Sequence, residues 1–110
     1  MHSGTSIVYA YGVLTNCQDL ALDMPQDDLA GVVESGPLRL LPFGIIAAIV
    51  SDFVLPDGKD LETILEDSRS AERLILNHHK VLANIVDQRT VLPLRFGAAF
   101  TKDAGVIAAL

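Results

Sequence analysis

The hydrophobic pattern of this chain is most regular between Asp60 and Asp87, where apolar residues recur every three or four positions. This spacing places them on one face of an amphipathic helix of about seven turns. Asp60 precedes the first apolar residue and is suited to cap the helix N-terminus. The apolar stripe contains Leu61, Ile64, Leu65, Ser68, Ala71, Ile75, His79, Leu82 and Val86.

A second apolar row lies beside this stripe and widens it beyond what contact with a single sheet requires. The row contains Leu74, His78, Val81 and Ile85. We therefore expect something besides the sheet to cover this part of the helix.

Residues 91–100 alternate at a period of two, which is typical of a β-strand with one face on a core. The apolar side contains Leu92, Leu94, Phe96, Ala98 and Phe100. The first three of these are expected to pack under the helix stripe. Pro93 lacks an amide donor and predicts a sheet edge, whereas Gly97 predicts a bulge or a bend.

Three shorter segments add strands to the predicted sheet. Residues 6–14 are apolar on both sides, which favours a central strand that is covered on both faces. Residues 38–41 and 45–50 form a predicted hairpin around the turn Pro42-Phe43-Gly44, and its second strand is expected to be fully buried. The chain is then expected to leave the sheet at residues 51–53.

The remaining segments are less regular. Residues 15–37 show no sustained period, although Pro25 favours the first turn of a short helix within residues 24–31. Near the C-terminus, Thr101 can cap a final helix that starts at Lys102.

The predicted element order is strand, irregular link, two strands, long helix and strand, which indicates an α+β fold. It fits a ferredoxin-like four-stranded sheet, antiparallel or mixed, of order 4-1-3-2, with one long helix on one face and the first helix reduced or replaced. The helix should make a right-handed crossover to a parallel neighbour. A different α+β sandwich is the alternative.

A chain of 110 residues predicts a single domain, residues 1–110. The final apolar helix is interrupted at Leu110, so we expect this domain to be the N-terminal part of a longer, two-domain protein.

The net charge of −6 argues against nucleic acid as a partner, because phosphate binding requires a basic stripe. No apolar run approaches the roughly 20 residues that a membrane span requires. The single Cys17 excludes an internal disulfide and fits a reducing cytosol.

The titratable side chains form no recognisable catalytic or metal-binding pattern. His78 and His79 would point about 100° apart on a helix, so they are not placed to bind one metal ion together. His79 lies on the apolar stripe and is expected to be a hydrogen-bonded core histidine. No glycine-rich phosphate loop precedes a helix at the required spacing. The sequence therefore predicts no catalytic residue, cofactor or metal, and a protein that is not an enzyme.

One charged residue, Arg95, lies in the middle of an apolar strand and needs a partner. If the helix covers the side of the sheet that carries Leu94, then Tyr9 and Tyr11 lie with Arg95 on the opposite face. A guanidinium group over aromatic rings is a favourable arrangement there. We expect this face to be a docking surface, and Tyr9, Tyr11 and Arg95 are the predicted partner-contact residues.

Four blocks in series resemble the N-terminal domain of the gas vesicle protein F/L family: residues 8–13, 44–51, 79–82 and 90–97. The most specific block is Thr-Val-Leu-Pro-Leu-Arg-Phe-Gly at residues 90–97, which follows a histidine-bearing helix. The resemblance covers nearly the whole chain from residue 7 onward.

This resemblance implies an accessory or minor structural protein of gas vesicle assembly, located at the gas vesicle in the cytoplasm. It implies contact with the small, hydrophobic gas vesicle shell protein and with other accessory proteins. The alternative function is a small-molecule-binding regulatory domain, which rests on analogy with other ferredoxin-like sheets.

Overall fold

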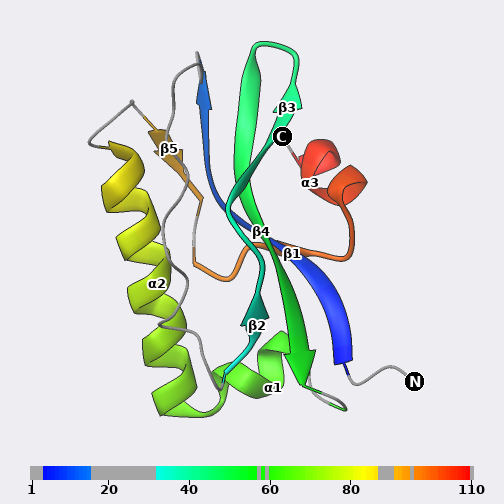
Figure 1. Cartoon of the computed structure of the whole chain (residues 1–110), viewed down its shortest axis with the longest axis vertical. Helices are drawn as coiled ribbons and strands as arrows, with labels where there is room; N and C mark the ends of the chain where they lie inside the picture. Colours follow the sequence, from blue (N-terminus) through cyan, green and yellow to red (C-terminus); the bar gives the residue numbers. More distant parts are fainter. Residues whose placement is uncertain are drawn as a thin grey trace.

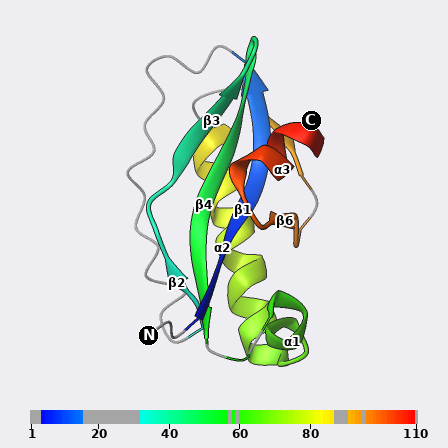
Figure 2. The same ribbon diagram turned by 90° about the vertical axis from the view of Figure 1, so that its right-hand side faces the viewer.

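The computed structural model describes residues 4–15, 32–56, 58, 60–86, 91–94 and 96–109, and every structural statement below refers to these residues. They form a six-stranded sheet with a long helix against one face and a short helix against the other, as Figure 1 and Figure 2 show. In chain order the elements are β1 (Gly4–Thr15), β2 (Glu34–Ser35), β3 (Arg39–Phe43), β4 (Ile46–Pro56), α1 (Leu61–Leu65), α2 (Ser68–Val86), β5 (Val91–Pro93), β6 (Ala99–Phe100) and α3 (Asp103–Ala109).

The sheet is built on two long central strands, β1 and β4, which pair with each other along most of their length. β2 and β3 both pair with β4, and β5 and β6 both pair with β1. Every one of these pairs is antiparallel. The central position predicted for the first strand is confirmed, because β1 has neighbours on both sides.

The structure confirms an α+β fold with an antiparallel sheet, but it differs from the predicted ferredoxin-like form in detail. The described residues form six strands and three helices, where four strands, one long helix and a short final helix were expected. The 4-1-3-2 order with a single helix is therefore not confirmed. The helices connect β4 to β5, and β1 lies between these two strands, so the crossover does not reach an adjacent parallel strand.

The long helix predicted from residue 60 is divided into α1 and α2, with the break at residues 66 and 67. The predicted cap at Asp60 is confirmed: its carboxylate accepts a hydrogen bond from the Thr63 amide at 2.8 Å. Asp67 makes a second cap of the same kind, since its carboxylate accepts from the amide of Ser70 at 3.0 Å and from its hydroxyl at 2.7 Å. A new cap inside the periodic pattern ends one helix and begins another.

The buried face of α2 differs from the predicted stripe. The buried residues are Leu74, Asn77, His78, Val81, Leu82 and Ile85, so the second apolar row predicted from the sequence faces the sheet. Ile75 and His79, which belong to the predicted stripe, are exposed. The predicted stripe is therefore wrong at Ile75 and His79, whereas Leu82 of the same stripe is buried.

The hairpin is confirmed, with β3 and β4 joined at Gly44 and Ile45. Gly44 has a φ of +64°, a conformation that glycine adopts without the steric cost of a side chain. β4 does not leave the sheet at residues 51–53 as predicted. It continues to Pro56 because β1 is long enough to pair with it as far as Gly4.

The strand predicted over residues 91–100 is interrupted. β5 ends at Pro93, β6 begins at Ala99, and Gly97 lies between them with a φ of +93°, which confirms the predicted irregularity. The predicted packing of one alternating row under the helix is wrong, because the break reverses the alternation. Leu92 is 69 % exposed, whereas Leu94 and Phe96 pack against opposite sides of the sheet.

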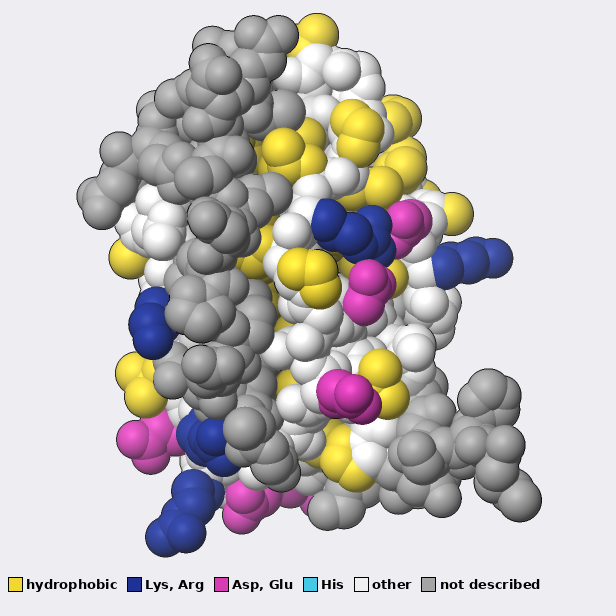
Figure 3. Space-filling model, in the orientation of Figure 1, with side chains coloured by type: hydrophobic (Ala, Val, Ile, Leu, Met, Phe, Trp, Pro, Cys, Tyr) yellow, Lys and Arg dark blue, Asp and Glu magenta, His cyan; other side chains and the backbone are white. Residues whose placement is uncertain are grey.

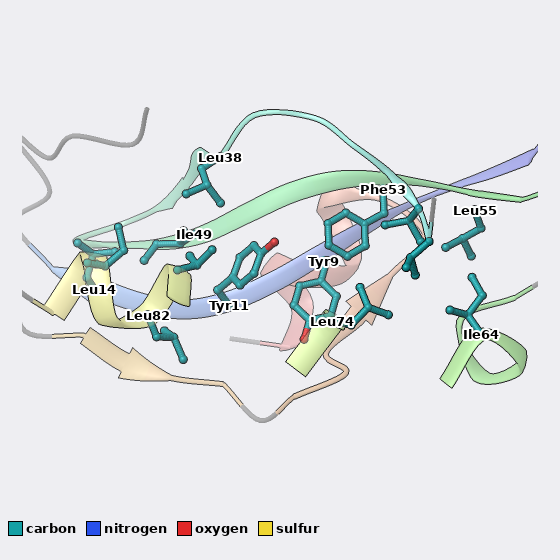
Figure 4. Close-up of a cluster of buried hydrophobic side chains, with 14 residues drawn as sticks. Tyr9, Tyr11, Leu14, Leu38, Ile49, Phe53, Leu55, Ile64, Leu74 and Leu82 are labelled. Atoms are coloured by element: carbon teal, nitrogen blue, oxygen red, sulfur yellow. The ribbon is translucent and has the colours of Figure 1, made fainter. Parts of the chain in front are cut away.

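Two apolar clusters fill the interior. The larger one lies between the sheet and α2 and includes residues of β1, β4, α1 and α2, as Figure 4 shows. The smaller one lies under α3, where Val106 packs with Val8, Ala10, Ala48 and Val50. The position of α3 confirms the helix predicted after Thr101. The short helix predicted within residues 24–31 lies outside the described residues.

Candidate partner-contact site and the buried polar network

Tyr9 and Tyr11 do not lie on the sheet face away from α2, where the sequence analysis placed them. Both rings point into the cluster under α2 and are almost completely buried (Figure 4). The face assignment is wrong because α2 carries polar side chains, Asn77 and His78, that bond to the two hydroxyl groups. A contact of these residues with a partner stays a prediction, and Arg95 lies outside the described residues.

The Tyr9 hydroxyl belongs to a chain of hydrogen bonds through the core. It lies 2.9 Å from Nδ1 of His78, and Nε2 of the same ring lies 3.1 Å from the carbonyl oxygen of Leu94. The Gly97 amide donates to the Tyr9 oxygen at 3.0 Å. A carbonyl oxygen only accepts, so Nε2 carries the proton of the neutral imidazole and Nδ1 accepts from the Tyr9 hydroxyl.

This chain compensates for the interruption of the edge strand. Leu94 and residues 96–98, which we call the break segment, lie between β5 and β6. Among the described residues, the Leu94 carbonyl and the Gly97 amide have no partner in the pairs that β1 makes with β5 and β6, and the side chains of His78 and Tyr9 supply one. Buried backbone groups need such partners, because an unsatisfied one costs free energy.

The surroundings of the network are aromatic. Tyr9 stacks on Phe53 with ring centroids 5.0 Å apart, and the edge of the His78 ring meets Phe96 at 5.8 Å. Burial raises the pKa of Tyr9 to about 12, against a smaller lowering effect of the Gly97 amide. Burial also lowers the pKa of His78. Both shifts favour neutral side chains in the core.

The buried, hydrogen-bonded histidine is His78, and not His79 as the sequence predicted. His79 is exposed, whereas His78 is 3 % exposed and makes the hydrogen bonds. The pattern of apolar residues was compatible with either ring, because two rows lie side by side on this helix. The sequence did contain a signal for His78. Tyr9 and Tyr11 lie two positions apart on β1, and the helix opposite them carries Asn77 next to a histidine.

On the other face of the sheet, Arg39 of β3 binds two carboxylates. Its Nε and Nη2 atoms donate to Asp52 at 3.2 and 3.0 Å, and its Nη1 and Nη2 atoms donate to Asp103 at 3.1 and 2.8 Å. The guanidinium lowers the pKa of the Asp103 carboxyl group. This double ion pair connects α3 to β3 and β4, so it holds the short helix over the smaller cluster.

Four large apolar side chains are exposed at one end of the molecule, and we call this group the apolar end. Its members and their exposed fractions are Phe43 at 48 %, Ile45 at 87 %, Val86 at 57 % and Leu92 at 69 %. The turn of the β3–β4 hairpin, the C-terminus of α2 and β5 meet at this end (Figure 1). Figure 3 shows hydrophobic side chains gathered over the β3–β4 hairpin and α3.

Among the described residues, no cluster of three histidine, cysteine or acidic side chains is placed to hold a metal ion. No helix in the described part of the chain is long and apolar enough to cross a membrane. The expectations of no catalytic residue and no cofactor stay predictions.

The fold and the exposed residues describe a small α+β protein with a polar network inside its core and an apolar end outside it. A family model described as "Gas vesicle synthesis protein GvpL/GvpF" matches residues 7–110. The chain therefore belongs to this family, which confirms the resemblance found in the sequence. No curated protein and no solved structure matches the chain.

Proposed function

We propose that this protein acts in gas vesicle assembly by contacting the small, hydrophobic shell protein through its apolar end. Membership of the gas vesicle synthesis family supports the role in assembly. The observation that carries the contact is the exposure of four large apolar side chains at one end of the sheet. Exposed apolar surface often marks a protein interaction site.

The apolar end has the chemistry that a hydrophobic partner requires. Complete burial of one exposed isoleucine, leucine or phenylalanine side chain contributes about 1.5–3 kcal/mol. Ile45 is the most exposed of the group, and its position in a hairpin turn makes it accessible from several directions. The residues of the apolar end come from separate elements, so their arrangement depends on the fold.

The predicted contact residues have different parts in this proposal. Tyr9 and Tyr11 are buried, so they support the sheet beneath the surface and touch no partner while α2 remains in place. Arg95 follows β5 in the sequence and remains a proposed contact residue. Contacts with other gas vesicle accessory proteins are also proposed on the basis of the family.

Co-expression with the shell protein, followed by co-purification, tests the proposal. The amount of shell protein that co-purifies should fall about tenfold or more in the double variant Ile45→Ser/Leu92→Ser. Each side chain contributes on the order of 1.5–3 kcal/mol to the binding free energy when it is buried. The variant's melting temperature should stay close to that of the original chain, since both residues are exposed.

Leu76→Ser is the matched control. Leu76 is 58 % exposed, like the residues of the apolar end, but it lies ten residues before Val86 on α2, which is a distance of roughly 15 Å. This variant should retain the shell protein as the original chain does. Equal retention by the double variant, or an equal loss with Leu76→Ser, would refute the apolar end as the contact site.

No observation on the described residues favours small-molecule binding, which is the alternative function considered from the sequence, or catalysis. Small-molecule binding by a ferredoxin-like sheet stays a prediction, as does the expectation that the protein is not an enzyme. Neither depends on the outcome of the shell-protein experiment.

A further inference from the structure

We propose that His78 is an acid-sensitive switch, and that protonation of its imidazole releases the break segment from α2. The proposal rests on the direction of the hydrogen bonds in the buried polar network. It concerns regulation of the fold and is independent of which surface contacts a partner.

Among the described residues, four hydrogen bonds hold the break segment, and they are of two kinds. Two are backbone bonds to β1: the Leu94 amide donates to the Tyr11 carbonyl at 3.0 Å, and the Ala98 carbonyl accepts from the Ala10 amide at 2.9 Å. The other two use the side chains of His78 and Tyr9. Two of these four bonds therefore belong to the hydrogen-bond chain that passes through the imidazole ring of His78.

In this chain of hydrogen bonds, each group donates to the next in one direction only. The Gly97 amide donates to the Tyr9 oxygen, the Tyr9 hydroxyl donates to Nδ1 of His78, and Nε2–H of His78 donates to the Leu94 carbonyl. A second proton on the ring would turn Nδ1 from an acceptor into a donor. The Tyr9 oxygen would then face two donors, Nδ1–H and the Gly97 amide, and its own hydrogen would have no acceptor in the chain.

Among the described residues, the rings that face His78 do not compensate for an added positive charge. Tyr9 and Tyr11 face the ring from β1, and the Tyr11 and His78 ring centroids are 5.7 Å apart. From α2 the nearest titratable group is His79, with its centroid at 5.9 Å, and from the break segment Phe96 meets the ring edge. Of these groups, His79 carries positive charge when protonated, which opposes protonation of His78.

The pKa of His78 agrees with this geometry. Burial lowers the pKa of the imidazole below its ordinary value of 6.5, the Leu94 carbonyl partly opposes that effect, and the charge on His79 lowers it further. The ring is thus neutral near pH 7.5. As the pH falls below 6.5, the tendency to protonate His78 favours states in which the ring leaves the core. The least costly such opening breaks the two side-chain bonds to the break segment.

Amide hydrogen exchange and NMR of the 110-residue chain, labelled with ¹⁵N, test the switch between pH 7.5 and pH 5. At pH 7.5 the His78 ring should be the Nε2–H tautomer, and the Gly97 amide should be protected. On acidification the protection factor of Gly97, which is corrected for the intrinsic pH dependence of exchange, should fall about tenfold or more together with His78 protonation. The amide of Val50, in the centre of the sheet, should keep its protection.

Two histidine variants separate the switch from a general acid effect. His79→Gln removes the exposed neighbouring ring, and the Gly97 response should remain. His78→Gln keeps a side-chain amide that can donate to the Leu94 carbonyl but does not titrate, so the response should disappear. If the latter variant does not fold, the titration of the original chain alone decides the question.

Several results would overturn the proposal. One is an Nδ1–H tautomer for neutral His78, because the chain of donors would then run differently. Another is constant protection of Gly97 while His78 titrates. Simultaneous loss of protection at Gly97 and Val50 would show global unfolding rather than release of one segment. Loss of the response in His79→Gln would assign it to the exposed ring.

Discussion

Tyr9→Phe removes one oxygen atom from the core and should strongly destabilise the protein. The substitution keeps the ring that stacks on Phe53, so apolar packing is retained. It deprives two groups of their partner, the half-buried Gly97 amide and Nδ1 of the buried His78. A fully buried polar group without a partner costs about 1–3 kcal/mol, so two such groups would cost about 2–6 kcal/mol. The partial exposure of Gly97 reduces the expected loss in the free energy of unfolding to roughly 2–4 kcal/mol.

Urea unfolding followed by circular dichroism measures this loss. With a slope of about 2 kcal/mol per M, the middle of the usual range, the midpoint should fall by roughly 1–2 M. The Tyr11→Phe variant is the matched comparison, because the Tyr11 hydroxyl accepts from Asn77 of α2, which is not part of the break segment. Only Tyr9→Phe should abolish the protection of the Gly97 amide at neutral pH.

A double-mutant cycle with His78→Gln completes the experiment. Because Tyr9 and His78 share one hydrogen-bond chain, their effects should be non-additive by about 0.5 kcal/mol or more. A loss below about 0.5 kcal/mol for Tyr9→Phe, or additivity in the cycle, would refute the role of the network in stability.

Three further predictions concern other parts of the molecule. The pKa of Tyr9 is raised from 10.0 to about 12, so its contribution to stability is complete below pH 10 and is lost as the pH rises to 12. Alkaline unfolding should therefore show a loss of roughly 2–3 kcal/mol in the free energy of unfolding, and this loss should be absent in Tyr9→Phe. Arg39→Ala should destabilise the protein by only about 1–2 kcal/mol in urea, with a smaller difference at 1 M salt, because its ion pairs are partly exposed; it should also raise the pKa of Asp103, which NMR measures. Gly12→Ala should cost about 1–3 kcal/mol in thermal unfolding, since the new Cβ would lie 2.9 Å from a methyl group of Val91; an unchanged melting temperature would mean that β5 moves away without cost.

Patterns that depend on neighbours along the chain were predictable from the sequence. The alternation and double-sided apolar character of residues 6–14 predicted a central strand, and Pro42 to Gly44 predicted a hairpin turn. Asp60 was recognised as a cap because its position before an apolar run is a local signal. Each of these features involves residues within a few positions of one another.

Features that depend on distant residues were missed. The cap at Asp67 was also missed, although its partner is local: Asp67 lies within the helical period, and its function as a second cap became visible only from its bonds to Ser70. Periodicity also did not decide which of two adjacent rows of the helix faces the sheet, and so it selected His79 instead of His78. The polar network joins residues up to 88 positions apart, Tyr9 and Gly97, and no spacing rule in a single sequence connects them.

Both described edges of the sheet carry a proline, Pro42 in β3 and Pro93 in β5. A proline has no amide hydrogen, so it interrupts the row of donors that an incoming strand would need. β5 has three residues and β6 has two, which leaves little continuous edge for main-chain pairing. Addition of a partner's strand is therefore disfavoured at these edges, and recognition should depend on side chains. Substitutions in a partner's side chains, rather than the β-propensity of its backbone, should then determine the affinity.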